Sequence, residues 1–397
     1  MMENETRGID TSAGVKRVFY IDNIRLYLTV LVILHHLSVG YGGSGGWFIK
    51  ESSFHAIDTF TVVLLTIFTA INQSYFMAFF FLLAGYFTPR SYDRKGSILF
   101  LKDRFIRLGI PVLIYVVFFA PLVDFILINF AYGGKASYID LMVNQIVQVD
   151  FQFGHLWFLL ALLIFALIYS LYRSIADRHN AKQRNNQFLD SFPANKVIFL
   201  SIGVLAVITF TVRLNFLIGD VVLFNFQLAH FTHYAFCFWI GILAYRGKWF
   251  EKLSKSQARI WIGVTLLTIS LLPLIMLLLV DFASSDPFGP FLGGMTFQSL
   301  VYSTWESVAL LSITISLLYI FQNKFNRQNR LLKELASSAY TAYIIHALVV
   351  ISIMIVLLPF TLPAMVKFVL ASLIGVPMIF GTSYLIRKIP FADRVLG

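Results

Sequence analysis

The chain carries ten apolar runs of about 20 residues, the length that crosses a bilayer as a helix. Inside lipid every backbone polar group must be paired within the protein, so such runs permit a helical membrane bundle and little else. Hydrophobic residues make up 58% of the 397 and charged residues 13%, against about 25% charged in soluble domains. We therefore predict an all-α integral membrane protein. Its predicted spans are 24–41, 71–88, 108–130, 155–173, 197–217, 227–245, 260–280, 297–321, 339–358 and 364–386.

The basic residues fall on one side of this predicted bundle. With both termini in the cytoplasm, the inner segments hold 27 of the 31 lysines and arginines; the exceptions are Lys50, Lys135, Arg213 and Lys367. An excess of basic residues in cytoplasmic loops orients membrane proteins. The net charge of +11 therefore indicates topology, and it gives no reason to expect a nucleic-acid partner. No repeat or soluble domain is evident, so we expect residues 1–397 to form one membrane-embedded domain.

One further apolar stretch, residues 56–70, tests this count. The polar triplet at 72–74 separates it from the next run. If both runs spanned the membrane, the basic block at 90–107 would lie outside, against the charge rule. We therefore predict that 56–70 forms an interfacial or re-entrant helix, preceded by a flexible turn at Gly42–Gly46.

Two adjacent histidines, His35 and His36, lie near the middle of the first predicted span. Ionisable residues at that depth are rare and usually functional. On a helix, His36 lies roughly 16 Å from Arg25 and about 20° off the same line, while His35 points roughly 80° away. Asp22 lies close to that line as well. A satisfied core histidine and an interfacial arginine are the alternative; we favour a functional stripe along Asp22, Arg25 and His36.

A pair of arginines precedes the third predicted span. Arg104 and Arg107 are three residues apart, so they share a helix face, and the planar guanidinium suits phosphate. The alternative is that they only anchor the helix on the cytoplasmic side, and the two readings are evenly balanced. Arg90 is a weaker candidate for the same anion site.

Glu306 lies inside the eighth predicted span, where an acid must be paired, protonated or solvated by a cavity. We favour a cavity shared with other site residues; Arg213 is either its partner or an interfacial residue.

His346 either lines the cavity of His36 or bonds a nearby carbonyl. His230 and His233 have a spacing that suits two metal ligands, but nothing completes a set, so packing is the favoured role.

No nucleotide-binding loop, nucleophile elbow, HExxH or CxxC motif occurs, and we expect no metal. His155 stands among aromatic residues at a predicted interface, a common place for it. The single cysteine, Cys237, excludes an intramolecular disulfide.

The order and spacing of several motifs are similar to those of a known family. The motifs are Arg25-x10-His36 after YIDNIRL, FFFLLAGYF at 79–87, Arg104-x-x-Arg107 before LGIP, GHLWFL at 154–159 and SSAYTAYIIHA at 337–347. Through them nearly the whole chain resembles the acyltransferase 3 family of membrane acyltransferases. Residues 71–116 further resemble the subgroup that includes glucan biosynthesis protein C.

The resemblance implies transfer of an acyl group, of acetyl or succinyl type, from cytoplasmic acyl-CoA to a hydroxyl of an envelope glycan outside a bacterial inner membrane. Acetyl-CoA is the expected donor. His36 would be the base or an acyl relay, since a neutral imidazole can take a hydroxyl proton. Arg25 and Glu306 complete the predicted catalytic set. Arg104 and Arg107, with Arg90, would hold the phosphates of coenzyme A.

Two other classes of protein are compatible with the pattern. A secondary transporter also has many spans, intramembrane charges and interrupted helices, although no inverted repeat is evident. An assembly subunit would have no use for a buried His36 or Glu306.

Overall fold

A computed structural model describes residues 19–178, 190–281, 283–284, 286–390 and 392–396. Across these residues the chain is helical, and β pairing is limited to one isolated bridge between Val222 and Phe226. Nine of the described helices are long and apolar enough to cross a membrane. Each predicted span coincides with part of one of them, which confirms a helical membrane protein.

The long helices are α1 (Phe19–Gly40), α2 (Thr59–Arg104), α6 (Trp157–Arg178), α7 (Asn195–Arg213), α8 (Phe231–Gly247), α10 (Lys255–Leu279), α12 (Phe297–Lys324), α13 (Arg330–Leu357) and α14 (Ala364–Arg387). Shorter helices are α3 (Ile110–Ile114), α4 (Ala120–Ile126), α5 (Tyr138–Gln148), α9 (Trp249–Lys252), α11 (Gly289–Leu292) and α15 (Ala392–Leu396). Single π-helical turns at Phe105–Gly109, Tyr115–Phe119 and Leu127–Ala131 join α2, α3 and α4 into one helical path.

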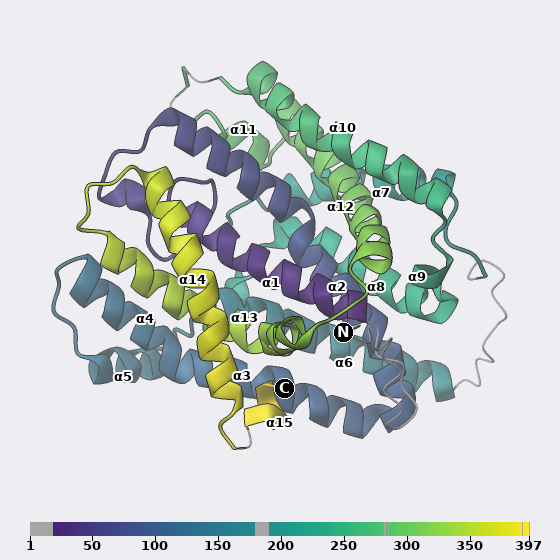
Figure 1. Cartoon of the computed structure of the whole chain (residues 1–397), viewed down its shortest axis with the longest axis horizontal. Helices are drawn as coiled ribbons and strands as arrows, with labels where there is room; N and C mark the ends of the chain where they lie inside the picture. The colour runs from purple at the N-terminus through teal and green to yellow at the C-terminus, as the bar shows by residue number, and fades with distance from the viewer. Residues whose placement is uncertain (1–18, 179–189, 282, 285, 391, 397) are drawn as a thin grey trace, which may run out of the picture.

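That path explains why nine helices contain ten predicted spans. It runs over 73 residues, Thr59–Ala131, or about 110 Å at helical rise, far more than a hydrocarbon core of about 30 Å. At Gly96 the backbone leaves helical geometry (φ 72°, ψ 172°), a conformation that glycine tolerates. Gly96 thus divides the path into two arms, visible as α2 and as α3 with α4 in Figure 1. Each arm contains one predicted span.

The prediction of a separate helix at 56–70 was wrong. Asp58 caps α2 by accepting from the Thr61 N–H (2.8 Å), a bond that also holds the pKa of its carboxyl below the ordinary value. From Thr59 the helix then continues without a break through the polar triplet. Two of its three side chains find partners inside the protein, which helps the helix to continue: Ser74 donates to the Ile71 carbonyl (2.7 Å) and Gln73 to the Tyr234 hydroxyl (3.3 Å).

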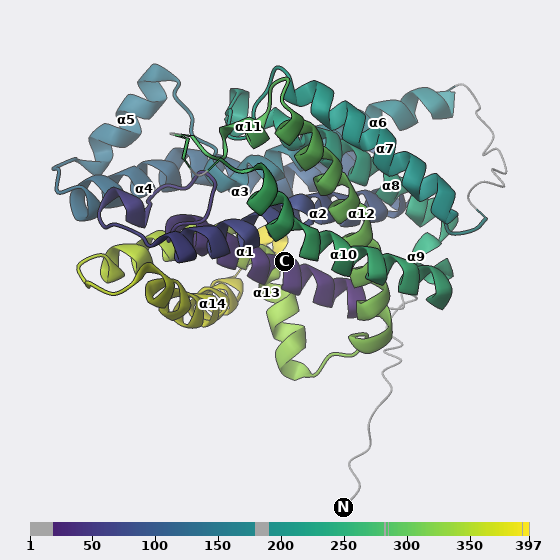
Figure 2. The same ribbon diagram turned by 90° about the horizontal axis from the view of Figure 1, so that it is seen from above.

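Helix α1 lies in the middle of the bundle, with α2, α12, α13 and α14 packed around it (Figures 1 and 2). Asn23 ties its N-terminal half to the α12–α13 loop by donating to the carbonyls of Phe325 (2.6 Å) and Arg327 (3.0 Å). Helices α2 and α8 approach most closely where Gly85 meets Gly241. A methyl group on either glycine would collide with the backbone of the other helix, so small residues set this contact.

The loop between α1 and α2 is fastened over the end of the bundle. Gly42 and Gly45 adopt positive φ angles that turn it back (131° and 142°), and the Ser44 N–H donates to Thr66 Oγ1 (3.2 Å). Further along, Glu51 accepts from Lys367 of α14 (Oε1–Nζ 2.6 Å), and both side chains are buried. Breaking a buried ion pair leaves an uncompensated charge at a cost of about 3–5 kcal/mol, so this pair holds the loop in place.

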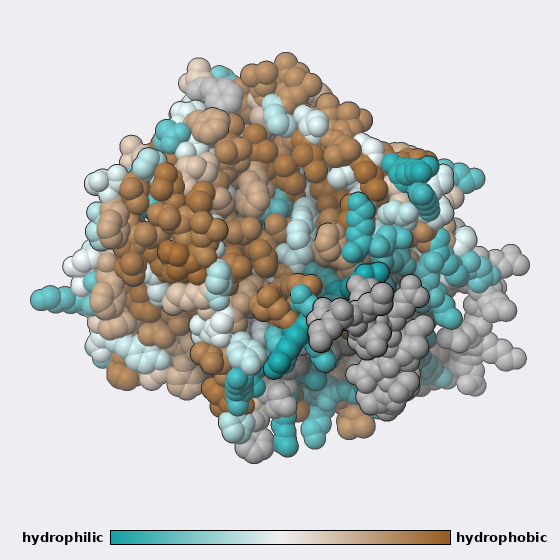
Figure 3. Space-filling model, in the orientation of Figure 1, coloured by the Kyte–Doolittle hydropathy of each residue, from teal (hydrophilic) through white to brown (hydrophobic). Residues whose placement is uncertain are grey.

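The surface divides by polarity. Figure 3 shows a broad hydrophobic face across α10, α12 and α14, with hydrophilic residues gathered around α9 and the start of α1. Leucines that are exposed on α10 and α14 include Leu266, Leu277 and Leu373. A face of this extent is unusual for a soluble monomer and suits contact with lipid.

Candidate active site

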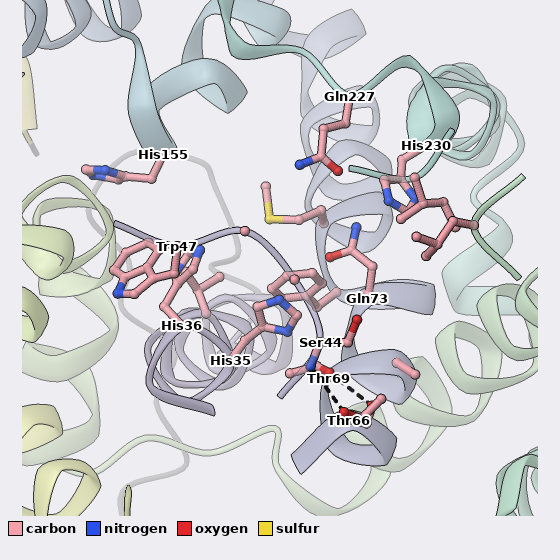
Figure 4. A pocket seen from close by; sticks show the side chains of 18 of the residues that line it. His35, His36, Ser44, Trp47, Thr66, Thr69, Gln73, His155, Gln227 and His230 are labelled. Atoms are coloured by element: carbon pink, nitrogen blue, oxygen red, sulfur yellow. Dashed lines mark hydrogen bonds between the residues drawn. The ribbon is translucent and has the colours of Figure 1, made fainter. Parts of the chain in front are cut away.

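A cavity of about 420 Å³ lies among α1, α2, α6, α8, α10, α12 and α13 and the loops that join them. This volume is typical of sites for small organic ligands. Its described lining includes histidine, glutamine, threonine and aromatic side chains, several of which are labelled in Figure 4. No aspartate, glutamate, lysine or arginine is among these lining residues. The cavity therefore offers many hydrogen-bonding groups and no formal charge.

His36 forms a dyad with His346 of α13 at one end of this cavity. His36 Nδ1 lies 3.0 Å from His346 Nε2, and His346 Nδ1 lies 2.6 Å from the Tyr343 carbonyl oxygen. Because a carbonyl only accepts, His346 carries its proton on Nδ1 and accepts at Nε2. His36 then donates from Nδ1, which leaves the lone pair on its Nε2. The Tyr343 carbonyl thus sets the tautomer of His36 through two successive hydrogen bonds.

Trp47 covers the dyad. Its ring stacks on His36 with centroids 4.0 Å apart and an interplanar angle of 21°. The loop that carries Trp47 is the one fastened by Glu51, so the position of this ring depends on the ion pair with Lys367. The tryptophan restricts the orientation of His36 and forms part of the cavity wall.

The floor near the dyad is built by Tyr343 and His155. The Tyr343 hydroxyl donates to the His155 carbonyl, and His155 Nε2 donates to the Ile344 carbonyl (2.9 Å). Both residues line the cavity. One turn earlier on α13, the Tyr340 hydroxyl donates to the Arg107 carbonyl. Tyr340 and Tyr343 are separated by about 4.5 Å of helical rise.

His35 lies on another side of α1, as its position in the sequence predicts, yet the cavity reaches it too. Its ring packs on Phe76 of α2 with centroids 4.8 Å apart. Its Nδ1 is buried and has no hydrogen-bond partner among the described residues. Both members of the histidine pair are therefore available to a ligand.

The predicted arginines gather beyond Tyr340, away from the cavity. Arg25 is half-exposed, lies 3.7 Å from Asp22 and stacks over Phe87. Arg104 lies within electrostatic range of Arg107, Arg25 and the Tyr340 phenol. The stripe along α1 thus has a cationic end at Arg25 and an imidazole end at His36. Arg90 is exposed on α2 beside Tyr86.

Glu306 is paired with Arg213, and neither side chain is exposed to solvent (0% each). Arg213 also donates to Ser303 Oγ (3.2 Å) and to the Ala229 carbonyl (3.3 Å). Glu306 does not line the cavity, because His230 stands between them: His230 Nδ1 lies 3.5 Å from Glu306 Oε1, and the ring lines the cavity. Arg213 and Lys367 lie within predicted spans, where the excess of basic residues on the cytoplasmic side does not explain them. Both belong to buried ion pairs.

The structure therefore brings His36 and His346 together and gathers Arg25, Arg104 and Arg107 in a separate cationic cluster. Glu306 lies behind His230, outside the cavity. The sequence interpretation missed Trp47, Gln73, His155 and His230 as cavity residues. One signal was present: Thr66, Thr69 and Gln73 recur at helical spacing on α2 and line the cavity together. No group of three or more potential metal-ligating side chains occurs in the described part of the chain.

Known proteins provide independent comparisons. A family model described as an acyltransferase domain matches residues 18–388. Proteins named glucans biosynthesis protein C, from Shigella dysenteriae serotype 1 (strain Sd197) and Escherichia coli (strain K12), are each 28% identical to this chain over 239 residues. The match covers 58% of this chain and 58% of each relative's length. No solved structure matches the chain.

Proposed function

The chain belongs to the acyltransferase 3 family, and from this we propose that it moves an acyl group from cytoplasmic acyl-CoA to a hydroxyl of an uncharged carbohydrate at the outer face. Acetyl-CoA is the first donor to test, with succinyl-CoA next. The proposal includes a bacterial inner membrane as the site of action. The observation that carries it is the His36–His346 dyad at the end of a cavity without formal charge.

His36 acts as the general base in this proposal. Its Nε2 lone pair takes the proton of the acceptor hydroxyl while the hydroxyl oxygen attacks the thioester carbonyl. The C–O bond forms, the C–S bond breaks, and the departing thiolate receives that proton to give free coenzyme A. His346 supports the transient imidazolium by accepting the hydrogen bond from His36 Nδ1, and the Tyr343 carbonyl supports His346 in turn.

The lining of the cavity supports an uncharged, hydroxyl-rich acceptor. Amides and hydroxyls such as Gln73, Gln227 and Ser44 both donate and accept hydrogen bonds. The aromatic rings of Trp47 and Trp157 offer flat apolar faces for the ring of a sugar. An ionic ligand would find no counter-charge among the described lining residues and would lose its hydration. The relatives' printed name, glucans biosynthesis protein C, favours glucans as the first acceptors to test.

The donor enters from the opposite side. Coenzyme A is polyanionic, so its phosphates remain at the exposed cationic mouth formed by Arg104 and Arg107, with Arg25 and Arg90 nearby. Only the thioester arm has to reach His36. Tyr340 at the mouth and Tyr343 at the cavity floor are one helical turn apart, so a short passage along α13 is sufficient. Displacement of the Tyr343 ring would open it.

Purified protein in liposomes tests the proposal directly. We expect release of coenzyme A thiol that depends on both an acyl-CoA and a neutral glucan, with the acyl group recovered as an ester on the glucan. Thiol release without ester would indicate a thioesterase. Movement of labelled glucan without consumption of acyl-CoA would indicate a transporter, and either result would refute acyl transfer.

A further inference from the structure

The end of the cavity away from the dyad carries a second histidine with its own buried support. Figure 4 places His36 and Trp47 at one end and His230 at the other, with Gln73 between them. His230 ends the 3₁₀ turn Leu228–His230 just before α8, and its ring is buried. Behind it lie Glu306 and Arg213, which have no access to the cavity themselves.

The ion pair determines how His230 presents its ring. Arg213 donates to Glu306 Oε2, Ser303 and the Ala229 carbonyl, and its Nη2 also lies 3.5 Å from His230 Nδ1. Glu306 Oε1 is the buried atom that lacks a hydrogen-bond partner, and His230 Nδ1 is 3.5 Å from it. A carboxylate only accepts and favours the proton on Nδ1, whereas a guanidinium only donates and favours it on Nε2. In both tautomers these two partners hold the Nδ1 edge, and Nε2 on the opposite edge is left to bond a ligand hydroxyl.

We propose that His230 is a binding residue for the acceptor, forming a hydrogen bond at Nε2 with a hydroxyl that does not react. Gln73, which donates to Tyr234 (3.3 Å), keeps its amide oxygen for the same ligand. Glu306 and Arg213 are then positioning residues, which act through His230. The proposal rests on the proposed function for its ligand class, an uncharged carbohydrate.

A buried ion pair at this point is otherwise poorly explained. Replacing such a pair by well-packed apolar residues is often neutral or stabilising, so packing alone gives no reason to bury Arg213 and Glu306. Orientation of the His230 imidazole toward the cavity provides one. It also separates the roles of the two histidines, since His36 meets the reacting hydroxyl and His230 fixes the ring that carries it.

His233 supplies a matched control. It is equally buried, lies one turn further on α8 and is also near Glu306 (Nδ1–Oε2 4.0 Å). Its Nε2, however, is occupied by Thr209 (3.3 Å) and Ser307 (3.2 Å), and it is not among the lining residues. A purely structural contribution of histidine beside Glu306 would affect both positions alike.

The experiment measures KM for a neutral gluco-oligosaccharide and for acetyl-CoA in His230→Ala, His230→Gln and His233→Ala. We expect His230→Ala to raise KM for the oligosaccharide about tenfold, or about 1.4 kcal/mol, with KM for acetyl-CoA unchanged. His230→Gln, whose amide reaches the Nε2 position, should recover part of the loss. His233→Ala should leave KM for the oligosaccharide within about twofold of wild type. Equal shifts in His230→Ala and His233→Ala, or no shift in either, would overturn the proposal.

A binding measurement separates this proposal from the proposed function. Trp47 and Trp157 line the cavity, so their fluorescence should report binding of the oligosaccharide without any turnover. If wild-type protein released no thiol, acyl transfer would be refuted, yet a tenfold weaker Kd in His230→Ala would still support the site. Absence of binding to wild type, or the same Kd in both proteins, would refute it.

Discussion

The arginine cluster that we propose as the donor mouth and the cavity differ in charge, although Tyr340, which bonds the Arg107 carbonyl, and Tyr343, which lines the cavity, are one turn apart on α13. Arg104, Arg107 and Arg25 cluster at the mouth, whereas the described cavity lining has no formal charge. Charge held in water is cheap and charge held in the membrane is costly. The arginine cluster is thus placed where a polyanion could reach it, while the cavity lining is neutral. Under the proposed function, this contrast would separate the two substrates by charge before they react.

The largest expected effect comes from removing the base at the boundary between the two regions. His36→Ala should lower kcat about 10²- to 10⁴-fold, the usual contribution of a positioned general base, with both KM values little changed. Thiol release by variant protein that elutes normally on size exclusion is the measurement. His346→Ala should cost less, since it removes only the partner of Nδ1; a greater loss there would place the base on His346 instead.

Placing a charge in the cavity should remove the difference in charge between the cavity lining and the arginine cluster. Gln73→Glu adds a carboxylate among neutral groups, and we expect KM for a neutral oligosaccharide to rise about thirtyfold, because ligand binding must strip water from that charge. Gln73→Leu is the control for loss of the amide alone and should have the smaller effect. If the two variants behaved alike, the absence of charge would have no role in selecting the acceptor.

Removing charge from the arginine cluster tests whether its cations bind the donor. Replacing Arg104 and Arg107 together by Ala should raise KM for acyl-CoA about tenfold and leave KM for the acceptor unchanged. The effect should shrink at high ionic strength, since these side chains are accessible to salt. Unchanged donor saturation would mean that the arginines only orient the protein in the membrane.

A smaller effect is expected at His35. His35→Ala should be milder than His36→Ala, raising KM for the acceptor severalfold with kcat nearly intact, because His35 lines the cavity but is not part of the dyad. Steady-state kinetics at saturating acyl-CoA separates the two parameters. Equal losses of kcat at both positions would remove the distinction between the two faces of α1.

The smallest effect is expected at Tyr343, which separates the cavity from the proposed donor passage. Tyr343→Phe removes the hydroxyl bond to His155 but keeps the ring, and we expect a two- to threefold change in turnover, which corresponds to about 0.5 kcal/mol, the lower end of a net hydrogen-bond contribution. Tyr343→Ala should also make the passage leaky to water, measured as acyl-CoA hydrolysis without acceptor. Hydrolysis at the wild-type level would show that other side chains close the passage.

The sequence predicted those features that one segment displays by itself. Apolar runs gave the spans, and a histidine in an apolar run marked His36. The helix at 56–70 was misread because the polar triplet beside it looks like a break, whereas Tyr234 of α8 satisfies Gln73. That partner is 161 residues away in sequence, so local patterns do not reveal it.

The missed cavity residues share the same cause. His36 and His346 are 310 residues apart, and Arg213 is 93 residues from Glu306. His155 and His230 each stand where an interfacial or packed histidine is common, and only the folded arrangement shows that both line the cavity with Trp47. Residue spacing within a helix shows which side chains share a face, but it does not show which residues of other helices pack against that face.

The ion pair between Glu51 and Lys367 has a consequence for biogenesis. Its two residues are 316 positions apart, and Lys367 belongs to α14, the last of the described long helices along the chain. Until α14 inserts, the loop that bears Trp47 lacks its Lys367 anchor and is held to α2 only through contacts such as that of Ser44 with Thr66. The wall over His36 is therefore expected to form fully only after α14 has been made.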